Sequence, residues 1–263
     1  MFKYLSRIIA AALLAGAVSA APANAADLKE IIAAGKVRIG VPADVPPFGS
    51  VDANNQPVGL DVDMANNIAK ALGVEVELQQ ITGANRVPYL ATDRLDIVIA
   101  AMGATPERAL QIAFTSPYAA LSIGVFGPDS IAVTSAAELT DQTVAVARGT
   151  TQDLMLSELA PNANIQRFDD DATAAAAFLS GQTQLLATAD VVAKDLMDKN
   201  AGAQLNPKFI MQFSPCYIGI QQGSPELLRW LDTFVHVGLR DGSLSELSEK
   251  WIGTPLPANF PSI

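Results

Sequence analysis

An arginine stands where the sequence predicts that a helix begins. In the stretch "GATPERA", Thr105 has the side chain of a helix N-cap, and Pro106 suits the first helical position. Arg108 then falls in the first turn, where the helix dipole favours an anion and disfavours a cation. A bound carboxylate relieves this conflict, because helix N–H groups and a guanidinium fork both bind carboxylates. An ion pair of Arg108 with Glu107 or another surface acid is the alternative interpretation.

Three more segments lie where a predicted strand leads into a predicted helix. They are "ITGANR", which ends at Arg86, "ARGTTQD" at 147–153, and "ATAD", which ends at Asp190. In open α/β sheets, ligands bind outside the carboxyl ends of the strands, where loops enter helix N-termini. We therefore expect these segments and the Arg108 turn to form one site.

The pattern of apolar residues predicts strands that alternate with helices. Strands are predicted over 36–41, 74–78, 95–102, 122–127, 143–147, 164–168, 183–189 and 217–223. Helices are predicted over 61–73, 85–91, 150–160, 171–181, 190–200, 225–240 and 243–251. This alternation is typical of open α/β sheets with helices on both faces. A second series of strands and helices begins at 143, and the strand at 217 leads the chain back to the first. The sequence therefore indicates two lobes joined by two crossovers, near 117–122 and 214–218.

Five motifs in register resemble a known family. They are "PPFG" with "QPVGLDVDMANNIAKALG", "RLDIVIAAMGATPERALQIAFTSPY", "TVAVARGTT", the "AD" at 189–190, and "LRDGSLSELSEKWIG". The chain resembles the extracellular solute-binding proteins of family 3, the polar amino-acid receptors of ABC importers. The resemblance implies a type II periplasmic-binding fold, an α/β fold of two hinged lobes. We expect residues 26–119 with 218–263 in lobe 1 and residues 120–217 in lobe 2.

The resemblance also implies roles for single residues. Arg108 would hold the α-carboxylate of a free amino acid, and Thr151, beside Thr150 at the helix start, would donate to it from the other lobe. Asp190 would accept from the α-ammonium group, together with the backbone carbonyl of Ala101. The bound amino acid would then pass to an inner-membrane ABC permease. No cofactor and no metal is expected.

Three positions depart from the family pattern. The family often has Gly where this chain has Ala101, and Ser or Thr where it has Gly103. A hydroxyl toward the ammonium group is therefore missing, although Gly103 still presents backbone groups closely. Many members have an aromatic residue at the position of Val45, so we expect a smaller or more polar wall around the ligand side chain.

Two further arginines bear on the identity of the ligand. Arg86 resembles part of an N-R-I-P element that is common among receptors for acidic amino acids, and Arg148 precedes Gly149 beside the expected cleft. If both enter the cleft, three arginines face one ligand, and aspartate or glutamate is the natural complement. A neutral polar amino acid is the second choice. Salt bridges at the surface or between the lobes are the alternative for both arginines.

The N-terminus and the net charge indicate where the chain works. Basic Lys3 and Arg7, the apolar run 8–18 and "ANA" before Ala26 predict a signal peptide over residues 1–25. We therefore expect a periplasmic monomer without a lipid anchor, and its single cysteine, Cys216, cannot form an internal disulfide. The formal net charge of −10 disfavours nucleic acid and anionic membranes as partners.

An enzyme on the same fold is the competing hypothesis. Some relatives are dehydratases that act on prephenate-like acids, which requires a general acid of raised pKa. The sequence singles out no residue for that role, so we predict a binding protein. Among the remaining acids, Asp61 and Asp63 are expected to cap a helix, with Asp61 alternatively facing the cleft. Residues 169–171 are likewise expected to cap the helix that follows.

Overall fold

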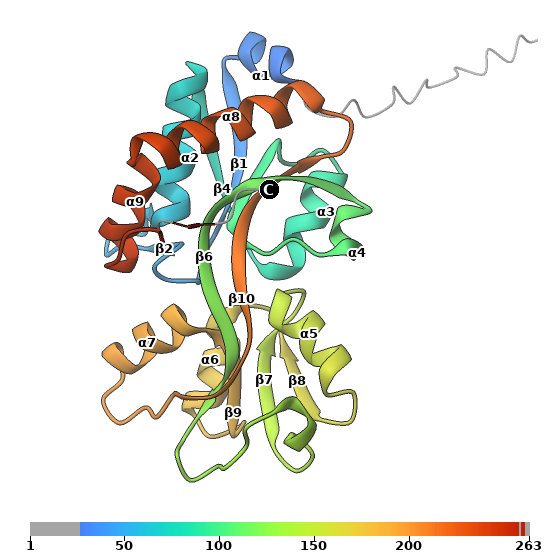
Figure 1. Cartoon of the computed structure of the whole chain (residues 1–263), viewed down its shortest axis with the longest axis vertical. Helices are drawn as coiled ribbons and strands as arrows, with labels where there is room; N and C mark the ends of the chain where they lie inside the picture. Colours follow the sequence, from blue (N-terminus) through green and yellow to red (C-terminus); the bar gives the residue numbers. More distant parts are fainter. Residues whose placement is uncertain (1–26, 258, 261–263) are drawn as a thin grey trace, which may run out of the picture.

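Two α/β lobes, one above the other in Figure 1, make up the computed structural model, which describes residues 27–257 and 259–260. The predicted signal peptide lies outside the described residues. The upper lobe, lobe 1, carries strands β1 (Lys36–Pro42), β4 (Glu75–Ile81) and β5 (Ile97–Met102) and a hairpin of β2 (Ser50–Val51) and β3 (Pro57–Val58). Its helices are α1 (Leu28–Ala34), α2 (Leu60–Leu72), α3 (Arg86–Ala91), α4 (Pro106–Ala109), α8 (Pro225–Asp241) and α9 (Ser243–Ile252).

The lower lobe, lobe 2, repeats the alternation of strand and helix. Its elements are β7 (Thr143–Ala147), α5 (Thr151–Leu159), β8 (Asn164–Phe168), α6 (Asp171–Leu179), β9 (Leu185–Ala189) and α7 (Asp190–Lys199). The strands of both lobes that precede helices pair in parallel, β1 with β4 and β5, and β7 with β8 and β9. The predicted α/β fold with two lobes is confirmed.

Two long strands run through both lobes. β6 (Ile112–Gly127) and β10 (Asn206–Gln221) pair antiparallel along their length. Together with the strands of both lobes they form one eight-stranded sheet in the order β4-β1-β5-β10-β6-β9-β7-β8. The predicted lobe limits, at 119/120 and 217/218, fall inside these two strands and stay a prediction.

The predicted lengths of these two strands are wrong. The sequence indicated strands only at 122–127 and 217–223, whereas β6 begins at Ile112 and β10 at Asn206. Prolines at 117, 207 and 215 interrupt the usual pattern of a strand. The structure accommodates Pro207 and Pro215 beside shifts of register in the β6–β10 ladder, where a strand tolerates the missing donor.

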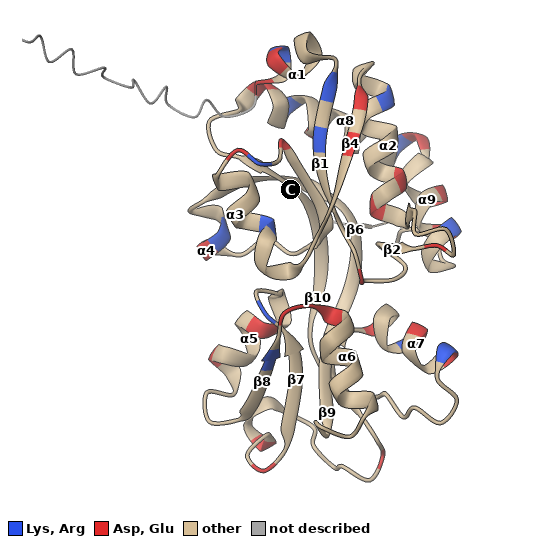
Figure 2. Ribbon diagram, turned by 180° about the vertical axis from the view of Figure 1, so that it is seen from behind, with Lys and Arg blue, Asp and Glu red and all other residues tan. Residues whose placement is uncertain are grey.

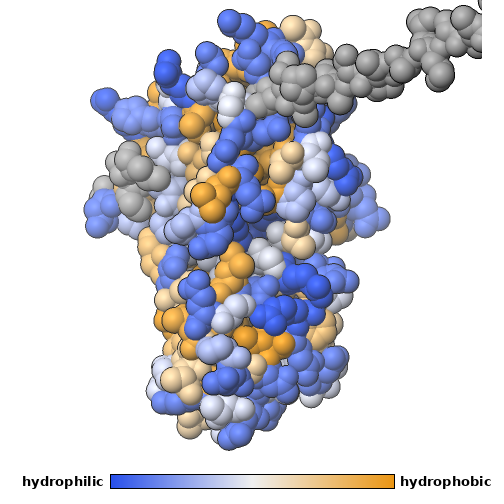
Figure 3. Space-filling model, turned by 90° about the vertical axis from the view of Figure 1, so that its right-hand side faces the viewer, coloured by the Kyte–Doolittle hydropathy of each residue, from blue (hydrophilic) through white to orange (hydrophobic). Residues whose placement is uncertain are grey.

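Each lobe has its own apolar core. In lobe 1 the core lies between α2, α8 and the sheet and includes Ile39, Ile99 and Tyr118. In lobe 2 it includes Val144, Leu156 and Leu185. No helix within the described residues is both long and apolar enough to cross a bilayer. On the face seen in Figure 3, hydrophilic residues dominate and hydrophobic ones gather in small groups on both lobes. The larger core also contains Ala189 and Val192, so apolar packing continues from lobe 1 onto α7 of lobe 2.

Candidate functional site

Helix starts from both lobes meet at the cleft. In lobe 1 the Thr105 hydroxyl caps α4 by accepting from the Arg108 N–H at 3.2 Å. In lobe 2 the Thr150 hydroxyl caps α5 by accepting from the Asp153 N–H, and Asp170 caps α6. Figure 2 shows the acidic turn before α6 at the top of the lower lobe, below α3 and α4. The predicted N-caps at Thr105 and before α6 are confirmed.

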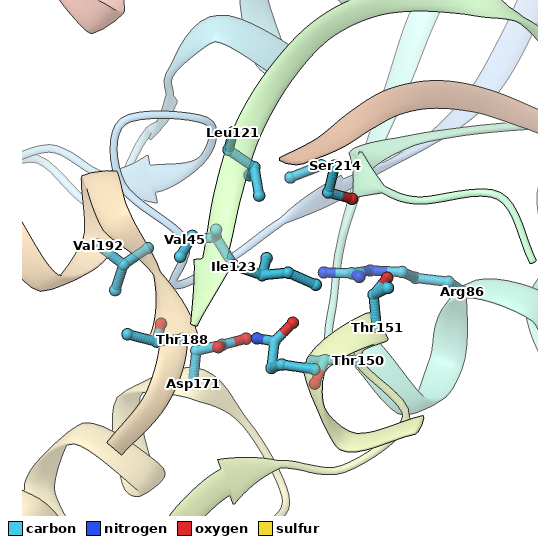
Figure 4. Close-up of a pocket in the computed structure, with 13 residues that line it drawn as sticks. Val45, Arg86, Leu121, Ile123, Thr150, Thr151, Asp171, Thr188, Val192 and Ser214 are labelled. Atoms are coloured by element: carbon cyan, nitrogen blue, oxygen red, sulfur yellow. The ribbon is translucent and has the colours of Figure 1, made fainter. Parts of the chain in front are cut away.

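A cavity lies between the lobes and opens onto residues of both (Figure 4). Its walls combine polar side chains, most of them at the starts of helices in both lobes, with apolar side chains that include two from β6. The residues that line it are Val45, Arg86, Ala101, Leu121, Ile123, Thr150, Thr151, Gln152, Asp171, Thr188, Ala189, Val192 and Ser214. Its volume is about 20 Å³, which is room for roughly one water molecule. An amino acid therefore enters only when the lobes separate.

Arg108 joins the two lobes beside this cavity. Its Nη1 donates to the Gly103 carbonyl at 2.6 Å and to the Thr151 hydroxyl at 3.1 Å. Its Nη2 donates to the Gly149 carbonyl at 2.8 Å. Gly103 belongs to lobe 1 and the other two partners to lobe 2, so the guanidinium bridges the cleft. The sequence-based grouping of Arg108 with Thr151 is matched by this contact.

The positive charge of Arg108 has no carboxylate beside it. Arg108 is only 6% exposed, and within the described chain no carboxylate oxygen lies within 4.0 Å of its guanidinium. The alternative prediction, an ion pair with Glu107, is therefore wrong. Burial lowers the pKa of Arg108 to about 10, and the nearby charge of Arg86 acts in the same direction. The cation is stable at neutral pH and is complementary to an anion that enters the cleft.

Arg86 lies at the start of α3 and points into the cavity (Figure 4). The side chain is 4% exposed, and its Nε has no hydrogen-bond partner. No described carboxylate forms an ion pair with it either. The alternative prediction of a salt bridge for Arg86 is therefore wrong. A buried cation with an unused donor is a group that a ligand side chain can satisfy.

Asp171 is a site residue that sequence reasoning missed. It is the first residue of α6, is 8% exposed and lines the cavity. Figure 4 shows its side chain and that of Arg86 pointing toward one another from opposite sides. Burial raises the pKa of Asp171 to about 7, and the neighbouring Asp44 adds to the shift while Arg86 opposes it. The sequence offered one signal for this site: three consecutive aspartates stand where one is enough to cap the helix, which leaves two for another role.

Asp44 links the loop after β1 to lobe 2. Its Oδ2 accepts from the Ala172 N–H at 2.7 Å, in the first turn of α6. The contact crosses the cleft and adds a second acceptor to a helix start that Asp170 already caps. Burial raises the pKa of Asp44, although the hydrogen bond from Ala172 opposes that shift.

Backbone geometry favours glycine at both departures from the family pattern in the strand that leads to Arg108, so it accounts for Gly103 but not for Ala101. Ala101 adopts a left-handed conformation with φ of 46°, which favours glycine. A Cβ at Gly103 would lie 3.0 Å from the Thr151 and Ser214 hydroxyl oxygens. A larger side chain at position 103 therefore obstructs the approach of the lobes seen here.

Asp190 lies beside the cavity without lining it. It is the first residue of α7, whose N-cap is Ala189. Its Oδ1 accepts from the N–H groups of Ser122 at 3.2 Å and Val191 at 2.8 Å. Because Ala189 does line the cavity, the carboxylate is one residue from the space expected for the ligand.

Arg148 does not join the other site residues. Its side chain is 58% exposed, and Nη2 lies 3.9 Å from Oδ1 of Asp169 at the surface. The turn at Gly149, with φ of 73°, separates Arg148 from Thr150 and Thr151, which are both buried in the cleft. The structure therefore corrects the prediction that Arg148 enters the cleft and matches the salt-bridge alternative.

Asp61 is not a helix cap. The N-cap of α2 is Gly59, and the Asp61 carboxylate, which is fully buried, accepts instead from the Tyr118 hydroxyl and the Ala101 N–H. Burial raises the pKa of Asp61 to about 7, and both hydrogen bonds oppose that shift. Within the described residues, no cluster of three or more His, Cys, Asp or Glu side chains could hold a metal ion.

Comparison with known proteins decides the family. A model of the bacterial extracellular solute-binding proteins, family 3, matches residues 37–254. This chain belongs to that family. The resemblance seen in the sequence motifs is thereby confirmed, and the family is one of extracellular solute-binding proteins.

The family assignment agrees with individual relatives over most of the chain. The putative ABC transporter arginine-binding protein 2 of Escherichia coli (strain K12) is 29% identical over 254 residues, which cover 94% of this chain and 99% of that protein. A solved solute receptor for L-cysteine of Neisseria gonorrhoeae is 32% identical with a TM-score of 0.81, over 86% of this chain and 94% of the receptor.

A third neighbour is described as an ancestral amino acid-binding protein, a precursor of cyclohexadienyl dehydratase. It is 33% identical with a TM-score of 0.77, over 85% of this chain and 98% of that chain. All three relatives are named as amino-acid-binding proteins or receptors. The first is also named for an ABC transporter, so these relatives are named for binding and not for catalysis.

Proposed function

We propose that the protein is a periplasmic receptor that closes on a free amino acid and delivers it to an inner-membrane ABC permease. One observation carries this proposal, which is the bridging position of Arg108. Its guanidinium is buried, bonds both lobes and has no carboxylate partner among the described residues. A ligand carboxylate at this point contacts both lobes at once and so stabilises the closed state.

The head group of an amino acid fits the charges beside Arg108. The α-carboxylate meets the guanidinium and the Thr151 hydroxyl, and the adjacent ammonium group meets Asp190 and the backbone at Ala101. Each charge-assisted hydrogen bond contributes about 1.5–3 kcal/mol, and micromolar affinity requires about 8 kcal/mol. Two such bonds to each head-group charge supply enough free energy for capture without covalent chemistry.

The side chain of the ligand is proposed to be acidic, as in aspartate or glutamate. With the head group compensated by Arg108 and Asp190, Arg86 is the cation that lines the cavity among the described residues, and its Nε has no acceptor. Asp171 opposes an acidic ligand only when it is ionised, and burial raises its pKa to about 7. A neutral polar side chain is the second choice, since Gln152 and Thr188 also line the cavity.

The names of the relatives support an amino acid but not one side-chain class. One is named for arginine and another for cysteine, which carry a basic and a neutral side chain. The side-chain class proposed for this chain therefore rests on Arg86 and Asp171. The proposed periplasmic location rests on the predicted signal peptide, and a monomer is proposed as the working form.

A thermal-shift screen of the ligand-stripped protein tests this proposal against the twenty amino acids and prephenate. A micromolar ligand at a thousandfold excess over its Kd adds about 4 kcal/mol of apparent stability, a large shift in the unfolding midpoint. A shift with aspartate or glutamate supports the full proposal. A shift with neutral or basic amino acids alone keeps the receptor and contradicts the acidic class. A shift with prephenate alone contradicts the receptor and favours a dehydratase-like enzyme.

A further inference from the structure

A buried hydrogen-bond cluster inside lobe 1 holds the backbone at Ala101. Oδ2 of Asp61, on the first turn of α2, accepts from the Ala101 N–H at 2.8 Å. Oδ1 of Asp61 accepts from the Tyr118 hydroxyl at 2.7 Å, and the Tyr118 oxygen lies 3.3 Å from the Ala101 nitrogen. Asp61 and Tyr118 are 0% and 1% exposed, and neither is among the residues that line the cavity.

The conformation of Ala101 needs such support. Its φ of 46° is left-handed, and a residue with a Cβ adopts it only when the surrounding structure imposes it. Ala101 also lines the cavity, together with Arg86 of the same lobe. The N–H of Ala101 is therefore fixed on the side away from the ligand by a carboxylate, while the residue itself faces the ligand.

We propose that Asp61, together with Tyr118, is a positioning residue for the ammonium group of the ligand. By binding the N–H of Ala101, Asp61 keeps the strand end in the left-handed turn that directs the backbone carbonyl toward the ammonium group. The inference rests on the proposed function, because it assigns Ala101 to the head group of an amino acid. It adds a residue of α2 to the recognition of that head group, although Asp61 touches no ligand.

Isothermal titration with L-aspartate, L-glutamine and L-malate separates positioning from a merely structural role. L-malate has a hydroxyl where L-aspartate has the ammonium group. In Asp61→Ala the affinity for both amino acids is expected to fall by about tenfold or more. The affinity for L-malate is expected to change by less than about threefold, since it has no ammonium group to position. In Asp61→Asn an amide oxygen still accepts from Ala101, so affinity should largely return.

Two variants keep the test sharp. Asp232→Ala is the matched control, because Asp232 also accepts from a backbone N–H, that of Ser116 on β6 at 2.6 Å. It is expected to lower the unfolding midpoint without changing the ratio of the affinities for L-aspartate and L-malate. In the Asp61→Ala background, Ala101→Gly should restore binding of the amino acids, because glycine adopts a positive φ without support.

Three results would overturn the inference. These are unchanged amino-acid affinity in Asp61→Ala, an equal loss for L-malate and L-aspartate, and the same affinity ratio in Asp61→Ala as in Asp232→Ala. If Asp61→Ala does not fold, Tyr118→Phe carries the test, with a smaller loss that is again confined to the amino acids. If the wild-type protein binds neither amino acid, the proposed function fails and this inference fails with it.

Discussion

Arg108 and Arg86 are both buried cations at the same cleft, yet their surroundings differ. The Arg108 guanidinium donates to two carbonyls and a hydroxyl, contributed by both lobes. The Nε of Arg86 has no partner, and the only acidic side chain that faces it across the cavity, among the described residues, is Asp171. In this arrangement of the lobes one guanidinium is held by groups of the protein, and the other has hydrogen-bonding capacity left over.

This difference separates two tasks of an amino-acid receptor. A fixed guanidinium suits the α-carboxylate, which every amino acid carries in the same place. An unsatisfied guanidinium suits the part of the ligand that varies, because leaving it unpaired costs free energy when the side chain is wrong. We therefore expect substitutions at the two arginines to differ both in how much affinity is lost and in which ligands lose it.

The largest effect is expected for Arg108→Ala. It removes hydrogen bonds to the α-carboxylate that contribute about 1.5–3 kcal/mol each, so Kd should rise by about 100-fold or more for every amino-acid ligand. Calorimetric titration of the ligands found in the thermal-shift screen measures this loss. Arg108→Lys keeps the charge but not the planar fork and should give an intermediate loss. Near-wild-type affinity in Arg108→Ala would contradict the assignment of the carboxylate.

The second-largest effect is expected for a substitution of Gly149, which contacts Arg108 and the turn before Arg86. Its carbonyl accepts from Arg108, and a Cβ added to it would lie 2.9 Å from the Cα of Ala84, in the loop before Arg86. Gly149→Ala should hold the lobes apart and weaken all ligands by about tenfold or more, because the clash is present only in the closed state. Small-angle scattering should show a smaller decrease in radius of gyration on ligand addition than in the wild type.

Gly181→Ala is the control for this change. Gly181 has a φ of 78°, close to the 73° of Gly149, but a Cβ added there meets nothing within 4 Å. Both substitutions introduce backbone strain, and only Gly149→Ala introduces the clash between lobes. Equal loss of affinity in the two variants would show that strain, and not closure, explains the effect.

Arg86→Ala is expected to change selectivity. Affinity for L-aspartate and L-glutamate should fall by about tenfold, the equivalent of one charge-assisted bond, while affinity for L-glutamine and L-alanine should change less. Competition titrations of the four amino acids against one another report this ratio directly. A uniform loss for all four would indicate that Arg86 stabilises the lobe and does not contact the ligand side chain.

The smallest effect is a pH dependence at Asp171. Its pKa is raised from 3.8 to about 7, so the carboxyl is mostly protonated below about pH 6 and mostly ionised above about pH 8. Ionisation adds a negative charge opposite an acidic ligand, and affinity for that ligand should fall several-fold as pH rises through 7. Asp171→Asn should abolish this slope and bind the acidic ligand more tightly at high pH. Because Asp61, whose pKa is also raised to about 7, affects all amino acids alike, the effect of Asp171 is the difference in slope between an acidic and a neutral ligand, and Asp171→Asn should remove that difference.

Local signals predicted most of what holds Arg108. The Thr105 cap and Pro106 place Arg108 in the first turn of α4 as expected, and a strand leads into each turn that meets the cleft. These features depend on residues close together in the chain, for which capping preferences and apolar periodicity are direct evidence. The contact between Arg108 and Thr151 was accessible only through the family motifs, since 43 residues separate them.

The remaining site could not be predicted because it depends on how the two lobes meet. Asp171 has the sequence of an ordinary helix start, and only the approach of lobe 1 gives it its environment: burial and Asp44 raise its pKa, and Arg86 opposes that rise. Arg148 and Thr150 are two positions apart, yet the left-handed turn at Gly149 places one at the surface and the other in the cleft. Nothing local in the sequence separates these outcomes.

The paired strands β6 and β10 form a two-stranded ribbon that can bend more easily than its strands can slide past one another. Sliding one strand along the other would break the ladder that runs from Ile112–Gln221 to Gly127–Asn206, so the ribbon resists shear. Bending needs no such loss, and we expect it at irregularities of the ladder such as those between Cys216 and Gly219. We therefore expect the lobes to rotate without sliding, so that each closure returns Arg108 to the same two partners in the opposite lobe.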